Sequence, residues 1–376
     1  MKRKWIAGAL ALALTATTIF AAAPSAVAAA GDGENDHGIG SGTTYYVSSE
    51  NGSDSNGGKS ESQAFQTLDK INEITLQPGD RVLLENGSVF EDQYLHIKGS
   101  GTEEAYIEIS TYGDESEGRP LINTNGKGVW YQDYGHQLDN KNHKYQGNVS
   151  SSILLKDVEY IEVRGLEITN DRTKGIDEAD KGLAYNDYRV MDRTGVAGVA
   201  QNKGTLEHIV LDDLYIHDVT GNVQNKHMAN GGIYFIVQEP ADEQTTGIAK
   251  YDDLVIENCR LERVNRWGIA AAYTTYHGKF GAAAIPDDLI RKYGATNVVI
   301  QNNILKKRAE TPLQRCTVTD RLSRTMFRKM LLRRSKMVFM MLLECLVGQH
   351  LERLQRQSGR GSVKTRCSST MSALIR

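Results

Sequence analysis

The chain has 376 residues, a formal net charge of -3 and only 4 Cys, and its composition is not that of a collagen, a coiled coil or a disulfide scaffold. This length is enough for one large core or for two ordinary domains. The charge is unevenly divided, because residues 306–376 carry a balance of +13 and residues 1–305 a balance of -16. The near-neutral average therefore says nothing about partners, and the two parts are interpreted separately.

The first thirty residues have the pattern of a secretory signal peptide. Residues 2–4 are basic, residues 5–20 are mostly apolar, and residues 26–30 offer small-residue cleavage sites. A membrane anchor is the alternative, but the apolar run is short for a span of about 20 residues. We therefore expect residues 1–30 to be removed, residues 31–42 to be a flexible start, and the protein to be secreted.

Export permits disulfide bonds, but residues 31–305 contain a single cysteine, Cys259. A disulfide framework is thereby excluded from this part of the chain. Its stability must come from burial and from backbone hydrogen bonds.

Short strands separated by turns follow the start. A β-rich run at 43–47 predicts a first strand, and the residues after the turn at 78–80 predict another over 81–84. Between them, Ala64, Leu68 and Ile71 have helical spacing. The sequence predicts one short amphipathic helix there and no other before the basic C-terminal part.

Internal repetition is the most informative feature of the chain. Four segments of eight residues align without gaps and start 48, 45 and 44 residues apart. Their first and third residues are always apolar, as on one face of a strand, and their sixth and eighth are apolar in nearly every copy. The segments are 161–168, 209–216, 254–261 and 298–305.

The fifth position of the repeat predicts a bend, because it holds residue types that tolerate the left-handed backbone conformation. These residues are Gly165, Asp213, Asn258 and Asn302. A Gly-Ile strand follows the middle two units at 232–236 and 268–272, and 195–199 is a counterpart after the first. Three short strands per turn indicate a solenoid with a continuous core. The alternative, a β-sandwich, would not place turn residues at one recurring position.

At this point the sequence resembles a known group of proteins. The strand–bend–strand–Gly-Ile pattern is similar to the right-handed parallel β-helix of the pectate-lyase-like superfamily. An N-terminal stretch resembles secreted members of it, with the sequence YYVSSENGSDSNGG, AFQTLDKINE and LQPGDRVLLENGSVF. The resemblance covers 43–305 and implies an all-β fold with one short N-terminal capping helix. It also implies extracellular enzymes that cleave or modify polysaccharides, alongside non-catalytic surface proteins.

The C-terminal part, residues 306–376, matches no strand period. One interpretation is a basic, partly helical appendage for nucleic acid or anionic surfaces. The other is a reading-frame shift near 306–309, because degenerate back-translation across 308–317 permits the string GGDAITTMYC, which supplies the missing Gly-rich strand. We favour the frame shift. It would make the chain a truncated β-helix with an irregular, helical or disordered tail.

Catalytic groups on such a fold come from outward strand residues and from loops. Hydrolysis of a glycosidic bond needs two carboxylates, and Asp218 and Glu262 occupy nearly equivalent places in adjacent repeats, where stacked strands lie about 4.8 Å apart. A lyase would instead need a base and a cation. The catalytic candidates are Asp218, Glu262, His217, His227, Arg263 and Arg266.

Substrate-binding and metal candidates lie in neighbouring loops. The substrate-binding candidates are Asp171, Trp267, Tyr273 and His277. An acidic loop with Asp177, Glu178 and Asp180 is a candidate Ca²⁺ site. Trp130, Tyr131 and Tyr134 either stack on sugar rings or form local core. For every charged candidate, a solvated loop residue is the alternative.

The sequence thus predicts a secreted enzyme that degrades polysaccharide, either a lyase or a glycoside hydrolase. We expect a monomer with a polysaccharide substrate, no nucleic-acid partner, no membrane attachment after signal cleavage, and no cofactor other than Ca²⁺ in the case of a lyase. A non-catalytic adhesion protein that binds glycan or protein is the alternative. As a truncated form, this chain is expected to be poorly active.

Overall fold

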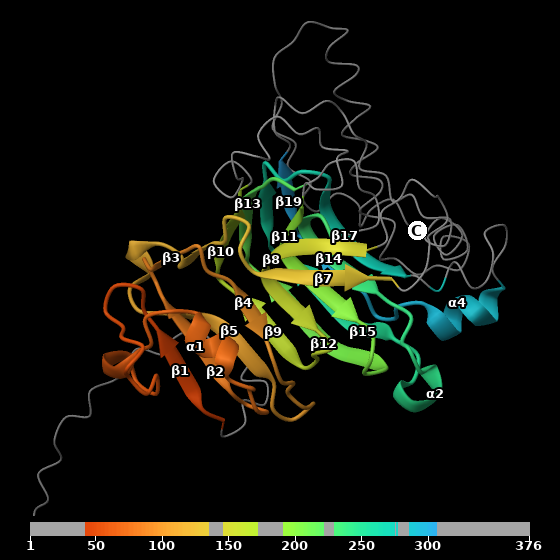
Figure 1. Ribbon diagram of the computed structural model, residues 1–376, viewed down its shortest axis with the longest axis horizontal. Coiled ribbons are helices and arrows are strands. Elements are labelled where there is room, and N and C mark those ends of the chain that lie inside the picture. Colours follow the sequence, from red (N-terminus) through yellow and green to blue (C-terminus); the bar gives the residue numbers. More distant parts are fainter. Residues whose placement is uncertain are drawn as a thin grey trace, which may run out of the picture. The chain divides into compact units, whose positions relative to one another are not determined.

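The computed structural model describes residues 42–134, 146–171, 191–221, 229–274, 276 and 286–306. These residues form an all-β arrangement of three sheets (Figure 1). Their strands pair in parallel, except for one antiparallel strand at Val129–Asp133. From the second strand onward, the chain passes from sheet A to sheet B to sheet C and back to sheet A. Each such pass is called a coil below, and the arrangement resembles a β-helix.

The elements are named in chain order. Sheet A contains β1 (Thr44–Val47), β2 (Arg81–Glu85), β5 (Ile107–Tyr112), β9 (Ile161–Arg164), β12 (Thr205–Asp212), β15 (Lys250–Glu257) and β18 (Val299–Gln301). Sheet B contains β3 (Val89–Glu91), β6 (Leu121–Asn123), β10 (Glu167–Asn170), β13 (Tyr215–Val219), β16 (Arg260–Glu262) and β19 (Ile304–Lys306). Sheet C contains β4 (Leu95–Ile97), β8 (Gln146–Lys156), β11 (Asp192–Ala200), β14 (Gly231–Val237) and β17 (Trp267–Thr274), with β7 (Val129–Asp133) paired to β8. Two short 3₁₀ turns are η1 (Glu61–Gln63) and η2 (Glu115–Glu117).

The predicted repeat is confirmed by the strand register. Ile161 pairs with Ile209, and Ile209 pairs with Leu254, so the first residues of three repeats stand side by side. Val255 pairs with Val299, which extends the same register to the fourth repeat. The Gly-Ile segments lie within β14 and β17, and the counterpart at 195–199 lies within β11.

The predicted bend is also confirmed. Its four residues have φ angles of 76°, 51°, 54° and 56°, at Gly165, Asp213, Asn258 and Asn302 respectively. A second left-handed column was not predicted and lies along sheet A, before β9 and β18 and within β12 and β15. Its φ angles are 50°, 47°, 59° and 50°, at Tyr160, His208, Asp253 and Asn297. Each coil therefore turns at stacked positions that few residue types tolerate.

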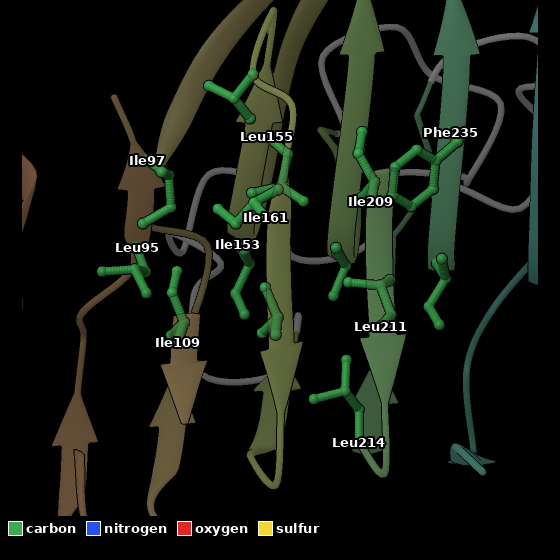
Figure 2. Packing of buried hydrophobic residues seen from close by; sticks show 14 of the residues in the cluster. Leu95, Ile97, Ile109, Ile153, Leu155, Ile161, Ile209, Leu211, Leu214 and Phe235 are labelled. Carbon is green, nitrogen blue, oxygen red and sulfur yellow. The ribbon is translucent and has the colours of Figure 1, made fainter. Parts of the chain in front are cut away.

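The core lies between the three sheets. In the first repeat, Ile161, Val163, Leu166 and Ile168 are all fully buried, and their counterparts in the next coils join the same cluster. Figure 2 shows part of this cluster, with Ile161, Ile209 and Leu211 among the labelled inward side chains. Burying one such side chain contributes about 1.5–3 kcal/mol relative to leaving it exposed. Cys259 is buried here as a free thiol, and burial raises the pKa of that thiol to about 12.

The prediction of a single helix was incomplete. The helix expected near Leu68 and Ile71 is present as α1 (Asp69–Glu73), but α2 (Glu243–Thr246) and α4 (Asp287–Tyr293) are additional. One turn of helix is too short to show a 3.6-residue period, and α2 begins where the Asp242 side chain accepts hydrogen bonds from two backbone N–H groups. No helix within the described ranges is long and apolar enough to cross a membrane.

An antiparallel pair of strands on sheet C shows which of Trp130, Tyr131 and Tyr134 are core residues. The strand β7 runs antiparallel to β8, an arrangement that the sequence did not predict. Tyr134 is 3% exposed and belongs to an apolar cluster on this sheet, whereas Tyr131 is 56% exposed. The indole of Trp130 donates a hydrogen bond of 2.8 Å to Ser151. Tyr134 is thus local core, and Tyr131 alone of the three presents an exposed ring.

Candidate functional site

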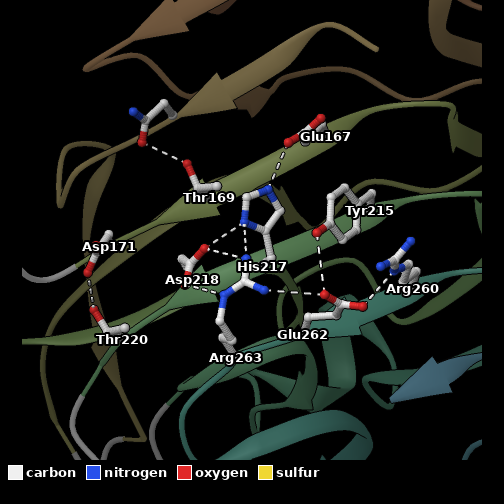
Figure 3. A network of polar contacts seen from close by, with 11 residues as sticks. Glu167, Thr169, Asp171, Tyr215, His217, Asp218, Thr220, Arg260, Glu262 and Arg263 are labelled. Carbon is white, nitrogen blue, oxygen red and sulfur yellow. Dashed lines mark hydrogen bonds and ion pairs between the residues drawn. The ribbon is translucent and has the colours of Figure 1, made fainter. Parts of the chain in front are cut away.

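The outer face of sheet B carries two rows of polar residues. In the strands of sheet B, residues such as Ile168 and Ile216 point into the core. The residues directly before and after each of them therefore point outward. In register, Glu167 pairs with Tyr215, and Tyr215 pairs with Arg260. The parallel row contains Thr169, His217 and Glu262. Most of the polar residues drawn in Figure 3 belong to these two rows, and the residues in that figure that contact Asp218 or Glu262 are called the sheet B cluster below.

Asp218 stands at an irregularity in β13. Thr169 pairs with His217 and Asn170 pairs with Val219, so Asp218 is an extra residue between the two pairs. It has a φ angle of 50°, and Arg263 in the next coil has a φ angle of 51°. Such bulges re-aim side chains at the end of a strand. Here they bring the carboxylate of Asp218 against the guanidinium of Arg263.

Arg263 binds Asp218 through two hydrogen bonds. Its Nε donates to Oδ1 at 2.8 Å and its Nη2 donates to Oδ2 at 2.7 Å. Its third nitrogen, Nη1, lies 3.3 Å from Oε2 of Glu262. One guanidinium therefore contacts both carboxylates and is held by charge-assisted bonds, which are stronger than neutral ones.

His217 is surrounded by charged groups. Its Nε2 lies 2.8 Å from Oε1 of Glu167, and its Nδ1 lies 2.7 Å from Oδ2 of Asp218. Nη2 of Arg263 is 3.1 Å from the same Nδ1. The imidazole also stacks on Tyr215, with ring centroids 4.4 Å apart. The ring thus joins the coil of β10 to the coil of β13.

Glu262 forms the centre of the other half of the cluster. Its side chain is 9% exposed and accepts from Nε of Arg260 at 2.7 Å. Nζ of Lys306 lies 2.7 Å from the same carboxylate, and the hydroxyl of Tyr215 lies 3.5 Å away. Because Lys306 ends β19, this carboxylate links three consecutive coils.

Both carboxyl groups are strongly acidic in this setting. The hydrogen bond from Arg263 lowers the pKa of Asp218 to about 2, with a smaller contribution from His217. The hydrogen bonds from Arg260 and Lys306 lower the pKa of Glu262 to about 2. Each group is therefore ionised at neutral pH, which suits a base or a nucleophile but not a general acid.

Asp218 and Glu262 occupy nearly equivalent places, with an offset of one residue between adjacent repeats. The register places Glu262 opposite His217, and Asp218 lies beside Arg263 instead. The offset is already in the sequence, because Asp218 is nine residues after Ile209 and Glu262 is eight residues after Leu254. The guanidinium of Arg263 contacts both carboxylates.

Asp171 lies at the edge of the same face but has other partners. Its carboxylate accepts a hydrogen bond of 2.9 Å from Thr220, and its backbone carbonyl accepts one of 2.8 Å from Arg193. In Figure 3 it lies apart from the carboxylates of Asp218 and Glu262. Its described contacts are those of a residue that joins neighbouring turns.

Trp267 begins β17 in sheet C, and Arg266 directly precedes that strand. The guanidinium of Arg266 lies 5.2 Å from the ring centroid of Trp267, and burial lowers the pKa of Arg266. Trp267 begins β17 opposite Gly231 and packs against the apolar cluster on the outer face of sheet C. Both residues thus lie at the start of the Gly-Ile strand, as the sequence predicted.

The remaining candidates lie outside the described residues. These are His227, His277, Asp177, Glu178 and Asp180, together with the side chain of Tyr273. Among the residues that are described, no group of three or more His, Cys, Asp or Glu side chains is placed to hold a metal ion.

Four members of the cluster were missed by the sequence analysis. Glu167, Tyr215 and Arg260 all occupy the seventh position of the eight-residue repeat, between two inward residues. Attention to outward positions within the strands, rather than to the loops after them, would have found all three. Lys306 follows the fourth repeat directly, and no signal pointed to it.

The described residues define an all-β protein with a coiled arrangement of three sheets and a charged outer face on sheet B. No protein-family model matches this chain. A curated lacto-N-biosidase from Bifidobacterium longum subsp. longum is 48% identical to it over 294 residues, which are 71% of this chain and 18% of that protein.

Two solved structures show the same relationship. The GH136 lacto-N-biosidase from Eubacterium ramulus, as its selenomethionine derivative, matches with 48% identity and a TM-score of 0.66, over 70% of this chain and 41% of that chain. The native protein matches with 48% identity and a TM-score of 0.64, over 69% and 41%. The chain therefore spans less than a fifth of the curated relative and about two fifths of the solved ones. Their fold supports a β-helix-like arrangement for this chain.

Proposed function

We propose that this chain is part of a secreted glycoside hydrolase that cleaves glycosidic bonds in oligosaccharides, with a right-handed parallel β-helix as its scaffold. The observation that carries the proposal is the 48% identity to lacto-N-biosidases, which extends over 71% of the chain. The signal-peptide pattern supports secretion. The sequential passage through three parallel sheets supports the solenoid.

Hydrolysis is preferred to lyase chemistry for an electrostatic reason. A lyase that acts on a uronate needs a cation to stabilise the substrate carboxylate. In the sheet B cluster, Arg263 faces both Asp218 and Glu262, and Arg260 and Lys306 both face Glu262. The cations of this cluster are already neutralised by carboxylates of the protein.

Within the proposed hydrolase, Asp218 and Glu262 supply ionised carboxylates. A glycoside hydrolase also needs a carboxyl group that is protonated at the working pH. With pKa values near 2, neither of these residues meets that need. We therefore propose that the general acid is a carboxyl group other than Asp218 and Glu262, and that the cluster holds the coils in place.

We also propose that residues 306–376 result from a shift of the reading frame. Residues 306–376 carry a balance of +13 and no strand period, whereas an alternative frame permits the Gly-rich strand GGDAITTMYC. Resequencing the gene tests this directly. An unchanged, uninterrupted reading frame with these codons would refute it.

Activity is tested with the chain as it stands and with a form repaired near residues 306–309. Both forms are incubated with a panel of oligosaccharides, and the lacto-N-biosidase of Eubacterium ramulus serves as the positive control. We expect the repaired form to release new reducing ends without ultraviolet absorbance. Products that absorb ultraviolet light would indicate a lyase, and binding without any product would indicate the adhesion alternative.

The role of the cluster is tested in the repaired form with Asp218→Asn. A scaffold role predicts a lower unfolding midpoint and nearly unchanged kcat in the folded protein. A catalytic carboxylate predicts a loss of kcat of about 100-fold or more. The second result would overturn the scaffold role and make Asp218 the base or nucleophile of the reaction.

A further inference from the structure

One aromatic side chain on the antiparallel pair β7–β8 is presented to solvent. Tyr131 is 56% exposed, and it is the only aromatic residue among the exposed large hydrophobic side chains of the described part of the chain. By contrast, the ring of Tyr215 on sheet B is covered by contacts with His217 and Arg260. A single exposed apolar side chain is ordinary, so the surroundings of Tyr131 determine what the ring can do.

The strand that carries Tyr131 is held in place through its other face. The indole of Trp130 donates to Ser151, and the buried amide of Gln132 accepts a hydrogen bond of 3.0 Å from a backbone N–H directly before β14. Gly128 enters the strand with a φ angle of 59°, and a Cβ atom there would lie 2.5 Å from the carbonyl oxygen of Ser151. Side chains alternate between the faces of a strand. The ring of Tyr131 therefore stands on a strand whose position is already fixed, which lowers the cost of binding a ligand.

The exposed face of this pair combines an aromatic ring with amides. Tyr131 pairs with Asn148 across the two strands, so both side chains lie on the same face. Asn148 is exposed, and so is Gln146, two residues earlier on β8. An amide both donates and accepts hydrogen bonds, as a sugar hydroxyl does. A pyranose has C–H groups on one face and hydroxyls around its rim, and it therefore matches a ring with amides beside it.

Charge and size narrow the choice of ligand. Val129 and Asp133 are exposed and share the face of Tyr131, because they alternate with Trp130 and Gln132 along β7. The carboxylate of Asp133 disfavours an anionic sugar on this face. The exposed apolar side chains of β7 are only Val129 and Tyr131, whereas a standard protein interface takes about 20–30 residues a side. We propose that the β7–β8 pair binds a neutral pyranose unit of an oligosaccharide, with Tyr131 stacking on the sugar and Asn148 bonding its hydroxyls.

The site is separate from the candidate catalytic residues. It belongs to sheet C, whereas Asp218 and Glu262 lie on β13 and β16 of sheet B. It rests on the proposed function only for the choice of a sugar as the ligand, and it requires no catalytic group. Binding at Tyr131 and hydrolysis are therefore distinct properties that distinct measurements test.

Saturation-transfer nuclear magnetic resonance on the full chain tests the binding. Methyl β-galactoside and methyl β-glucoside are the neutral probes, and galacturonate is the anionic counterpart. We expect the neutral probes to receive saturation at their C–H protons and to bind about 10-fold more weakly to Tyr131→Ala, because ring stacking and apolar burial are both lost. Tyr131→Phe keeps the ring and should keep most of the binding. Galacturonate should bind more weakly than the galactoside.

Val89→Ala is the matched control, because Val89 is 50% exposed on β3 of sheet B. This variant should bind the probes as the wild type does. Affinities are compared among variants with the unfolding midpoint of the wild type, as expected for changes at exposed side chains. Equal affinities of the wild type and Tyr131→Ala, or no saturation of any neutral probe, would overturn the site.

Two further outcomes are distinguishable. A dimer in sedimentation that Tyr131→Ala dissociates would mean that the face binds a second copy of the chain, and it would also overturn the sugar site. Binding that depends on Tyr131 in a repaired form without hydrolysis would support the site and count against the proposed function alone.

Discussion

Arg263 binds both carboxylate oxygens of Asp218 across the boundary between two coils, at 2.8 Å and 2.7 Å. Both residues have left-handed backbones, so the two bends stack and direct their side chains at each other. The geometry is bidentate, which adds direction as well as strength. This pair distinguishes Asp218 from an ordinary solvated carboxylate at a strand end.

Replacing Arg263 by lysine tests the bidentate pair. Lysine keeps the charge but offers no fork of donors, so Arg263→Lys should lower the free energy of unfolding by about 1 kcal/mol, since the pair is partly exposed. Arg263→Met removes the charge as well and should cost more, because Asp218 and Glu262 are left facing each other. Urea unfolding at pH 7 measures both. Equal stability of Arg263→Lys and the wild type would show that the fork contributes nothing.

Acid should destabilise the cluster. The folded pKa values of Asp218 and Glu262 lie near 2, below their ordinary values, so the stability they provide is complete above about pH 5. It is lost progressively as the pH falls from about 4 towards 2. Unfolding midpoints measured at several pH values should fall over this window. In Asp218→Asn the fall should be shallower, and an unchanged slope would contradict the lowered pKa.

The inward column of sheet B offers a matched pair of leucines. Leu261 is 1% exposed and pairs with Leu305, which is 45% exposed. Leu261→Ala should cost about 2–5 kcal/mol, because it leaves a cavity in the core. Leu305→Ala should cost less than about 1 kcal/mol, since much of that side chain already contacts solvent. Similar losses for the two variants would mean that the end of the column is covered in solution.

The left-handed bend is tested at Asn258. Its φ angle is 54°, and its side-chain amide donates to Asp212 at 2.8 Å. Asn258→Val and Asn258→Gly both lose this hydrogen bond. The difference in stability between the two variants therefore measures the cost of the left-handed backbone conformation. We expect the valine variant to be less stable than the glycine variant by about 1–2 kcal/mol. Thermal unfolding provides the measurement, and a valine variant as stable as the glycine variant would contradict the assigned bend.

Much of the fold was predictable because it repeats. Apolar residues at the first and third positions of each segment, and a bend residue at the fifth, are local signals that recur at 44–48-residue spacing. The register then confirmed them, with Ile161 beside Ile209 and Ile209 beside Leu254. Repetition works as a signal because stacked coils place like residues on like residues.

Insertions between repeats were not predictable in the same way. The antiparallel β7 and the single-turn α2 interrupt the coils once each and leave no period. Their positions depend on contacts made after the coils have stacked, such as the hydrogen bond from Trp130 to Ser151. A sequence pattern of local spacing does not contain these contacts.

The candidate site was predicted only in part. The sequence analysis named Asp218, His217, Glu262 and Arg263, which the fold does bring together. Its count left an offset of one residue between Asp218 and Glu262, and the register aligns Glu262 with His217. It also took both carboxylates for an acid–base pair, whereas their partners hold both as anions.

By itself, the sequence determined the parallel coils, their inward faces and the left-handed bends, since these follow from residue types at fixed spacing along the chain. Only the tertiary structure decided which charged side chains meet. Asp218 meets Arg263, Glu262 meets Lys306, and His208 meets two carboxylates, each across a coil boundary of more than 40 residues. Ion pairs of this kind depend on register and on side-chain direction within a few tenths of an ångström, and neither is encoded in local spacing.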